Sequence, residues 1–208
     1  MANAPILSQE EHARIAEAVA RAEEKTSAEI RVAVSTTPLV GHTHHVTLWA
    51  ALIALVLPWL VILLVPMPTL RLLAVQAAAF VLLCGILAIP SVARGLVPRR
   101  EKRMAAQVLA RQVFLAHGLH QTAARTGILI LVAPEERLVE VVADTGVHEA
   151  LGADAWQRIC DAVSAKASGG ALGEGIVQGV TLAGELLGGP MPVRPGDRNE
   201  VPDRVVML

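Results

Sequence analysis

Aromatic residues and cysteines are scarce in this sequence of 208 residues, which has no tyrosine, two phenylalanines and two cysteines. So few aromatic rings provide no platform on which the bases of a single-stranded nucleic acid could stack. The net charge of −1 adds no attraction for phosphates. Cys84 lies in an apolar run and Cys160 in an expected soluble helix, so no disulfide is predicted. Nucleic acid is therefore excluded as a partner, and a reducing compartment is favoured.

The recognised catalytic motifs are also missing. No Gly-x-Ser-x-Gly nucleophile turn, no phosphate-binding P-loop and no Gly-x-Gly-x-x-Gly after a strand occurs. The sequence therefore identifies no catalytic residues, and the interpretation leans away from an enzyme.

Charge is nearly absent from the middle of the chain, where Arg71 is the only charged residue between Val46 and Ala93. Two apolar runs, 46–65 and 72–93, flank a short proline-rich connector. At about 1.5 Å per residue, each run is long enough to cross a hydrocarbon core about 30 Å thick. Core helices of a soluble protein are the alternative, but two adjacent runs of this length are rare outside membranes. The first run also follows a folded-looking segment, unlike a cleaved signal peptide. The sequence predicts a transmembrane hairpin.

Basic residues near the two runs predict the orientation of this hairpin. The connector carries Arg71 alone, whereas seven basic residues lie near the outer ends: Arg31, Arg94, Arg99, Arg100, Lys102, Arg103 and Arg111. The positive-inside rule then places both termini in the cytoplasm of a two-pass protein of a bacterial inner membrane. A membrane-surface cluster that would meet anionic lipid headgroups consists of Arg94, Arg99, Arg100, Lys102 and Arg103. The lipid bilayer is thus an expected partner.

The soluble segments alternate between helical and strand patterns. Ser8 and Glu11 form a capping box before a helix over 9–25, and 28–36 alternates as a half-buried strand. A basic helix over 98–121 is expected to turn Met104, Val108, Leu115 and Leu119 to one side. The remaining expected elements are strands at 127–133 and 138–144, helices from 154 and over 172–187, and a short strand at 205–207.

A lone helix and strand at the N-terminus cannot bury a core. Both ends of the hairpin emerge on one side of the membrane, so the flanking segments can fold together. The prediction is one discontinuous α/β domain from residues 1–45 and 94–190, with the hairpin of 46–93 inserted in a loop. Residues 191–208 form a proline-rich tail.

The order of these segments resembles the TPM domain family in its membrane-bound bacterial form. The resemblance is carried by Ser27–Val34, Thr126–Val132, Glu136–Asp144, the helix around Trp156 and the ending Asp197–Arg204. It implies a mixed sheet flanked by helices. It also implies a family with weak acid phosphatase activity, calcium binding and accessory roles in the assembly or repair of membrane complexes.

Two groups of side chains are candidate metal ligands. Asp144 and Glu149, with Glu29 from the neighbouring strand, offer oxygen ligands suited to calcium or magnesium. A solvated turn with a helix-starting Asp explains Asp144 as well. His42, His44 and His45 can bind zinc or nickel, or can form a polar linker that titrates near neutral pH. In the tail, Asp197, Asn199, Glu200 and Asp203 lack the spacing of a helix-loop-helix calcium loop.

These observations favour a membrane-anchored accessory or interaction module whose partners are other membrane proteins. The alternative is a weak acid phosphatase assisted by calcium or magnesium, with Asp144, Glu149 and Glu29 as ligands. A transporter component is disfavoured, because two spans would need an oligomer and no charged residue lies within them.

Overall fold

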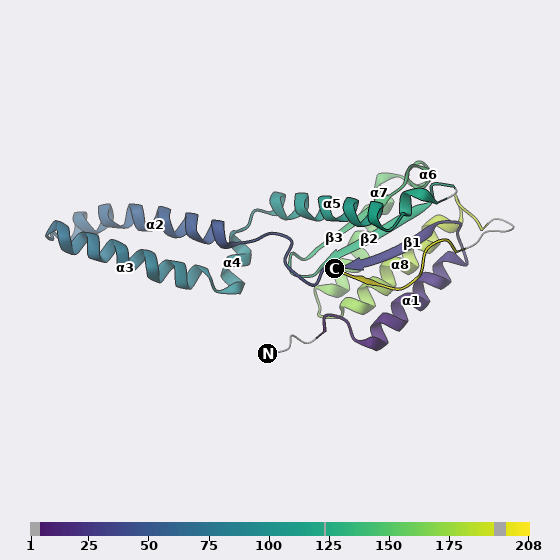
Figure 1. Cartoon of the computed structure of the whole chain (residues 1–208), viewed down its shortest axis with the longest axis horizontal. Helices are drawn as coiled ribbons and strands as arrows, with labels where there is room; N and C mark the ends of the chain where they lie inside the picture. The colour runs from purple at the N-terminus through teal and green to yellow at the C-terminus, as the bar shows by residue number, and fades with distance from the viewer. Residues whose placement is uncertain (1–4, 123, 194–198) are drawn as a thin grey trace. The chain divides into compact units, whose positions relative to one another are not determined.

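The computed structural model describes residues 5–122, 124–193 and 199–208. The chain divides into two compact units, of which one combines Met1–Leu39 with Arg103–Leu208 and the other is Val40–Lys102. The first unit contains a four-stranded mixed sheet with helices on both faces, and the second contains the two long apolar helices (Figure 1). The predicted fold class is confirmed.

Strands from both sides of the apolar helices form a single sheet. Its order is β3-β2-β1-β4, made of β1 (Glu29–Val34), β2 (Gly127–Ala133), β3 (Leu138–Ala143) and β4 (Val206–Met207). β1 pairs in parallel with β2 and with β4, and β2 pairs with β3 as an antiparallel hairpin. Ile30 of β1 lies opposite Ile128 of β2 in this register, almost a hundred positions later in the sequence. β1 is an inner strand of the sheet because β2 and β4, which both come later in the chain, pair with its two edges.

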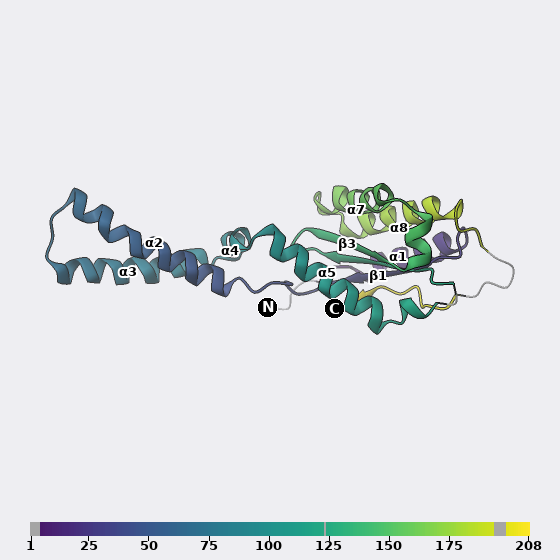
Figure 2. The same ribbon diagram turned by 90° about the horizontal axis from the view of Figure 1, so that it is seen from above.

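Helices cover the two faces of the sheet unequally. α1 (Gln9–Glu23), α7 (Ala153–Ala167) and α8 (Leu172–Gly188) lie on one face and α5 (Arg99–Ala116) lies on the other (Figures 1 and 2). Because successive strand residues point to opposite faces, Ile128 and Ile130 join the larger core while Leu129 and Leu131 pack with Phe114 of α5.

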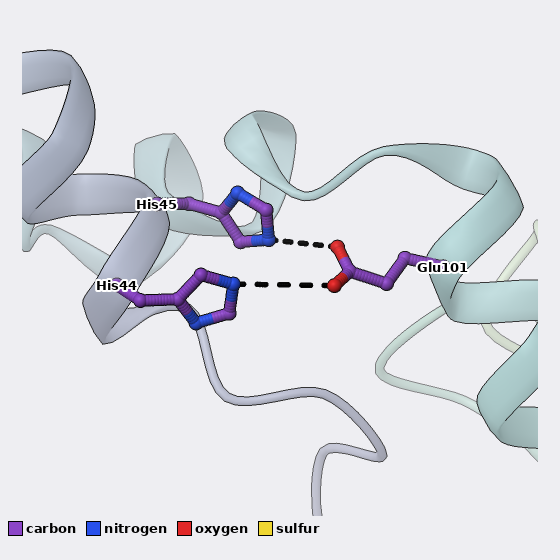
Figure 3. Close-up of side chains that lie close together, drawn as sticks. All are labelled: His44, His45 and Glu101. Carbon is purple, nitrogen blue, oxygen red and sulfur yellow. Dashed lines mark hydrogen bonds and ion pairs between the residues drawn. The ribbon is translucent and has the colours of Figure 1, made fainter.

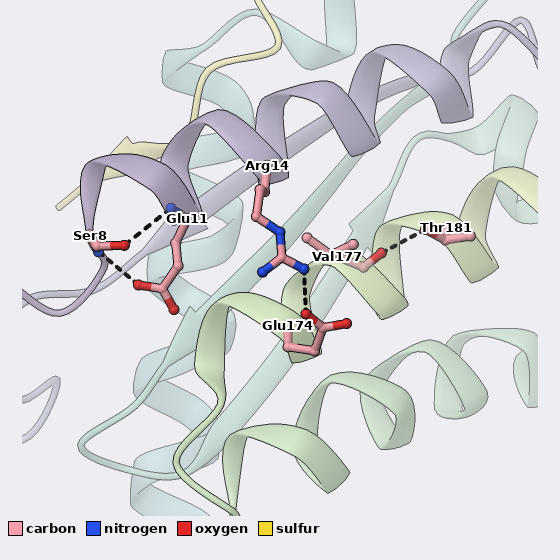
Figure 4. Close-up of polar contacts among 6 residues, drawn as sticks. All are labelled: Ser8, Glu11, Arg14, Glu174, Val177 and Thr181. Atoms are coloured by element: carbon pink, nitrogen blue, oxygen red, sulfur yellow. Dashed lines mark hydrogen bonds and ion pairs between the residues drawn. The ribbon is translucent and has the colours of Figure 1, made fainter.

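Polar contacts define the start of α1 and its attachment to α8 (Figure 4). Ser8 Oγ accepts from the Glu11 amide at 3.2 Å, and the Glu11 carboxylate accepts from the Ser8 amide at 2.8 Å, which is the predicted capping box. These bonds with Ser8 lower the pKa of Glu11. Arg14 forms an exposed ion pair with Glu174 of α8 at 2.5 Å. α1 and α8 are thus joined by polar contacts as well as by their apolar faces.

β1 differs from the half-buried strand predicted from its alternation. All six of its residues are buried, including Glu29 at 7% exposure and Arg31 at 5%. The C-terminal tail and His117 supply partners for these charged side chains. The Arg31 guanidinium donates to the carbonyl of Pro202, and its Nη2 lies 3.2 Å from His117 Nδ1. The alternation in β1 therefore distinguishes apolar from polar residues, but both kinds are buried.

Three of the four apolar residues predicted to share one side of α5 do recur at helical spacing, and that side is exposed: Met104, Val108 and Leu115 are each more than half exposed. The buried residues of α5 are Ala106, Ala110, Val113 and Phe114. The helix ends at Ala116, and Leu119 is buried in a separate 3-10 turn, η1 (Leu119–Gln121).

The second unit consists of α2 (Thr43–Leu64), α3 (Thr69–Leu87) and the short α4 (Pro90–Leu96). α2 and α3 lie side by side, and their 22 and 19 residues are long and apolar enough to cross a membrane (Figure 1). α2 continues through Pro58. The second apolar run, predicted to extend to residue 93, instead breaks before Pro90, which begins α4 at a position where its missing N–H costs nothing.

Candidate functional site

The three predicted metal ligands lie on different elements. Asp144 caps α6 (Thr145–Ala150), a short helix that the sequence pattern did not reveal. Its Oδ1 accepts from the Thr145 amide at 2.7 Å and lies 3.8 Å from the Arg125 guanidinium. Glu149 is exposed on α6, and Glu29 is buried at the start of β1. Asp144 thus has the role of a helix-starting Asp, which was the alternative interpretation of this residue.

The sheet register separates Glu29 from Asp144. Glu29 is opposite Gly127 on β2, and the Asp144 amide bonds to the Gly127 carbonyl from the other side. Two strand spacings place their Cα atoms about 9.6 Å apart. The Leu119 carbonyl lies over Gly127, where an added Cβ would come within 2.1 Å of its oxygen. Within the described residues, the three carboxylates form no group with ligand atoms inside 4.8 Å. Their assignment to a metal stays a prediction.

Glu29 instead faces a group of acidic side chains that the tail completes. Its Oε1 and Oε2 accept from the amides of Glu200 and Val201 at 3.2 and 3.1 Å. Next to it, Glu23 of α1 accepts from the Ile30 amide at 2.8 Å and from Asn199 Nδ2 at 3.1 Å. The same Asn199 nitrogen donates to Asp203 at 2.5 Å.

These groups line a cavity of about 290 Å³, the acidic pocket. Its lining consists of Ala20, Glu23, Glu24, Thr26, Ser27, Ala28, Glu29, Val193, Asn199 and Asp203. Burial raises the pKa of Glu23 to about 8, with the carboxylates of Glu29 and Asp203 adding to the rise and the Ile30 amide and Arg31 opposing it. At neutral pH Glu23 therefore mainly holds its proton, which lowers the negative charge of the pocket.

The donor atoms of the acidic pocket fit a hard cation. Carboxylate, amide and hydroxyl oxygens are the ligands that calcium and magnesium prefer. The Ser27 hydroxyl is buried and has no hydrogen-bond partner in the described part of the chain, so it has unused capacity as a ligand. By the same distance criterion, Glu23, Glu29 and Asp203 do not bring their ligand atoms within 4.8 Å of one another in the described part of the chain, so the pocket is acidic but is not an assembled metal site.

Sequence reasoning found part of this pocket. It singled out Glu29, and it noted Asn199 and Asp203 without assigning them a site, while Asp197 and Arg198 of the same tail lie outside the described residues. Glu23 was missed, although a carboxylate six residues before Glu29, at the end of α1, was a usable signal. What no spacing could supply is the pairing of β4 with β1, which brings the tail back to the sheet.

A second depression, the edge groove, runs along the outer strand β3 and encloses about 370 Å³. It lies between α5 and α7 and is lined by Arg103, Gln107, Arg137, Leu138, Val139, Glu140, Val141, Trp156, Gln157, Cys160, Asp161 and Ser164. Burial raises the pKa of Glu140, and it raises that of the Cys160 thiol to about 11. A thiol with that pKa is protonated at neutral pH, so Cys160 supplies no reactive thiolate in the groove.

The predicted membrane-surface residues lie on α4 and at the start of α5. Arg94, Arg99, Arg100 and Arg103 are exposed, and Lys102 donates from Nζ to the Arg94 carbonyl at 2.7 Å. Farther along α5, exposed Met104, Val108 and Leu115 recur at helical spacing. Arg100 and Arg111 fall on the same side by this spacing.

Comparisons with known proteins agree with this architecture. Residues 93–186 match the family model of the TPM domain. The solved NMR structure of the BA42 protein from the psychrophilic bacterium Bizionia argentinensis is similar, with a TM-score of 0.63, 20% identity and 100% of both chains covered. At that identity the likeness concerns the fold. No curated protein matches the sequence.

Proposed function

We propose that the apolar hairpin anchors the domain that contains residues 93–186, which match the TPM domain model, at the cytoplasmic face of a bacterial inner membrane. There the domain acts as an interaction module for other membrane proteins. The observation that carries the proposal is the exposure of α2 and α3: Leu63 and Leu70 are 81% and 80% exposed, and α3 has no buried residue. The core helix of a soluble protein would bury these side chains.

Charge and amphipathicity support the orientation. Exposed Arg94, Arg99 and Arg100 can each contribute about 1 kcal/mol near an anionic surface. The exposed row of Met104, Val108 and Leu115, flanked by arginines, is typical of a helix that lies in the headgroup region. Because this row follows the hairpin directly along the chain, it continues the membrane contact beyond α4.

The edge groove is the surface that we assign to partner proteins. Edge strands present unpaired N–H and C=O groups, to which an extended segment can add as a further strand. β3 is such an edge, and the two helices beside it turn polar side chains and Trp156 toward the added segment. The buried Trp156 Nε1 has no acceptor within the described residues, so an incoming carbonyl can satisfy it. The occupant is therefore an extended polar segment of another membrane protein.

Membrane attachment is tested by washing membranes that contain the full chain with alkaline carbonate. An integral hairpin keeps the chain in the pellet, and reporter fusions at both termini should be active only in their cytoplasmic form. Recovery of the chain in the supernatant, or a terminus cut by protease added from the periplasm, would overturn the proposal.

The interaction role is tested by photocrosslinking in cells. A photoreactive residue is placed at Gln157 in the edge groove or, as a matched control, at Gln178, an equally exposed glutamine on α8. We expect a discrete membrane-protein adduct from position 157 only. Equal adducts from both positions would remove the groove from the proposal, and no adduct at either would count against an interaction module.

A second candidate function, the metal-assisted acid phosphatase, is favoured by the acidic pocket alone. There Glu23, Glu29 and Asp203 offer a hard cation oxygen ligands, and such an ion would supply positive charge for a phosphoryl group. It is tested by calcium titration and by hydrolysis of a generic phosphate ester, with Glu29→Gln as the variant. Calcium binding without hydrolysis of the ester from acidic to neutral pH would show that an ion in the pocket has a structural role and not a catalytic one.

A further inference from the structure

A third group of side chains lies within the unit Val40–Lys102. His44 and His45 stand in the first turn of α2, and Glu101 stands in the first turn of α5. His45 Nε2 is 2.8 Å from one Glu101 oxygen, and His44 Nε2 is 3.9 Å from the other. Figure 3 shows both rings directed at the same carboxylate. All three ligand atoms lie within 4.8 Å of one another.

We propose that His44, His45 and Glu101 bind one divalent transition-metal ion, with zinc as the ion the geometry fits best. Zinc bonds of about 2.0–2.1 Å in a tetrahedron set neighbouring ligand atoms about 3.4 Å apart. The nitrogen–oxygen distances of 2.8 and 3.9 Å lie on either side of that value. A shift of about half an ångström in each exposed side chain therefore forms the site.

Ligand type and exposure agree with this ion. Imidazole nitrogen favours zinc, nickel, cobalt and copper over calcium and magnesium, so the site differs in kind from the acidic pocket. His45 is 13% exposed, whereas His44 and Glu101 are 63% and 44% exposed, so the group is open on one side. Three protein ligands with an open side leave the fourth position for water or for an atom of another molecule.

Such an ion would cross-link the two ends of the hairpin. Fifty-six positions separate His45 from Glu101, and the closed loop includes α2, α3 and α4. Closing a loop of this length restricts the unfolded chain and stabilises the closed form. We therefore assign the metal a structural role, as a clamp that fixes the starts of α2 and α5 to each other. This assignment does not depend on whether the hairpin crosses a membrane.

The test uses the full chain in mild detergent, purified through a tag without histidine and stripped with EDTA. Titration with Co²⁺ should give the intense visible absorption of a tetrahedral site at one ion per chain, and Zn²⁺ should displace it. His44→Ala, His45→Ala and Glu101→Gln should each weaken binding at least about tenfold, since even residues that only orient a ligand contribute about 10- to 100-fold. Zn²⁺ should raise the unfolding temperature of the unchanged chain but not that of these three variants.

Two control variants distinguish a specific three-ligand site from unspecific metal binding by a histidine-rich segment. His42→Ala removes the neighbouring histidine outside the group and should leave binding unchanged, and Glu101→His should retain Co²⁺ with an altered spectrum. Absence of Co²⁺ absorption, an undiminished affinity in Glu101→Gln, or an equal loss in His42→Ala would each overturn the proposal. Membrane fractionation of the same variants reports on anchoring separately.

Discussion

Single residues show how differently the same side chain behaves in different surroundings. Glu11 is a solvent-facing cap with a lowered pKa, whereas Glu23 is desolvated beside two further carboxylates and has a raised one. Both lie on the same helix, and the sequence pattern treats them alike. The difference arises because Asn199 and Asp203 come to lie against the end of α1, which brings negative charge to Glu23 and removes water from it.

The stability of the domain should therefore depend on the protonation of Glu23. Its pKa of about 8 exceeds the ordinary 4.5, so the folded chain binds more protons than the unfolded chain between these values. The free energy of unfolding should be highest below about pH 4.5 for this group and should fall as pH rises to about 8. Glu23→Gln, neutral at every pH, should flatten this dependence. Thermal unfolding of both chains across that range measures it.

Glu17→Gln is the control for this prediction, because Glu17 is exposed on the same helix. It should keep the pH dependence of the unchanged chain. If the unfolding temperatures of the unchanged chain and of Glu23→Gln varied with pH in the same way, the Glu23 carboxyl would not be desolvated.

Gly127 occupies a position that has no room for a side chain. A Cβ there would lie 2.1 Å from the Leu119 carbonyl oxygen, a backbone atom that cannot move aside cheaply. Gly127→Ala should destabilise the domain by about 1–3 kcal/mol, the usual cost of overpacking. Gly189→Ala should be close to neutral, since nothing lies within 4 Å of its added Cβ. Chemical denaturation of the two variants distinguishes these outcomes, and equal stabilities would contradict the close approach.

The positions of helices and strands in the sequence were easier to predict than which of their sides is buried. β2 has the bounds expected from its continuous apolar run, because a strand buried on both faces needs apolar residues at every position. For α5 the sequence predicted which apolar residues share a side but not which side packs on the sheet: Ala106, Ala110, Val113 and Phe114 are buried, and Met104, Val108 and Leu115 are exposed. α6 has six residues, too few for a helical period to be visible.

The capping box should contribute more to α1 than the ion pair beside it. Ser8→Ala removes the acceptor for the Glu11 amide and should cost about 1 kcal/mol of stability. Glu174→Gln breaks the ion pair with Arg14, which is half exposed, and should change stability by less than about 1 kcal/mol. Thermal unfolding monitored by circular dichroism compares them. A larger loss in Glu174→Gln would reverse this ranking.

The whole molecule consists of a unit built around the mixed sheet, which the apolar helices interrupt in sequence. β1 comes before them and β2 after them, yet the two strands pair along six residues. Contacts separate Val40–Lys102 from the remainder, so the hairpin forms a compact unit of its own. The exact bounds that the sequence predicted for the domain, 1–45 and 94–190, stay a prediction.

Replacing residues 42–97 by a flexible glycine-serine linker should leave a folded, water-soluble domain. The pairing of β1 with β2 and the two apolar cores lie outside the replaced segment, so their burial is retained. Circular dichroism and size-exclusion chromatography without detergent test this expectation. Aggregation of this shortened chain, with loss of its helical signal, would show that the domain needs the hairpin to fold.

The sequence by itself determined the elements whose signals are local: the capping box, the buried run of β2, and the two long apolar helices. Each follows from a periodicity or from the absence of charge within one segment. The tertiary structure alone decided which residues meet across long separations, as the tail does with Glu23 and Glu29 and as Glu101 does with His44 and His45. Such meetings depend on strand register and on chain reversals, which no local pattern encodes.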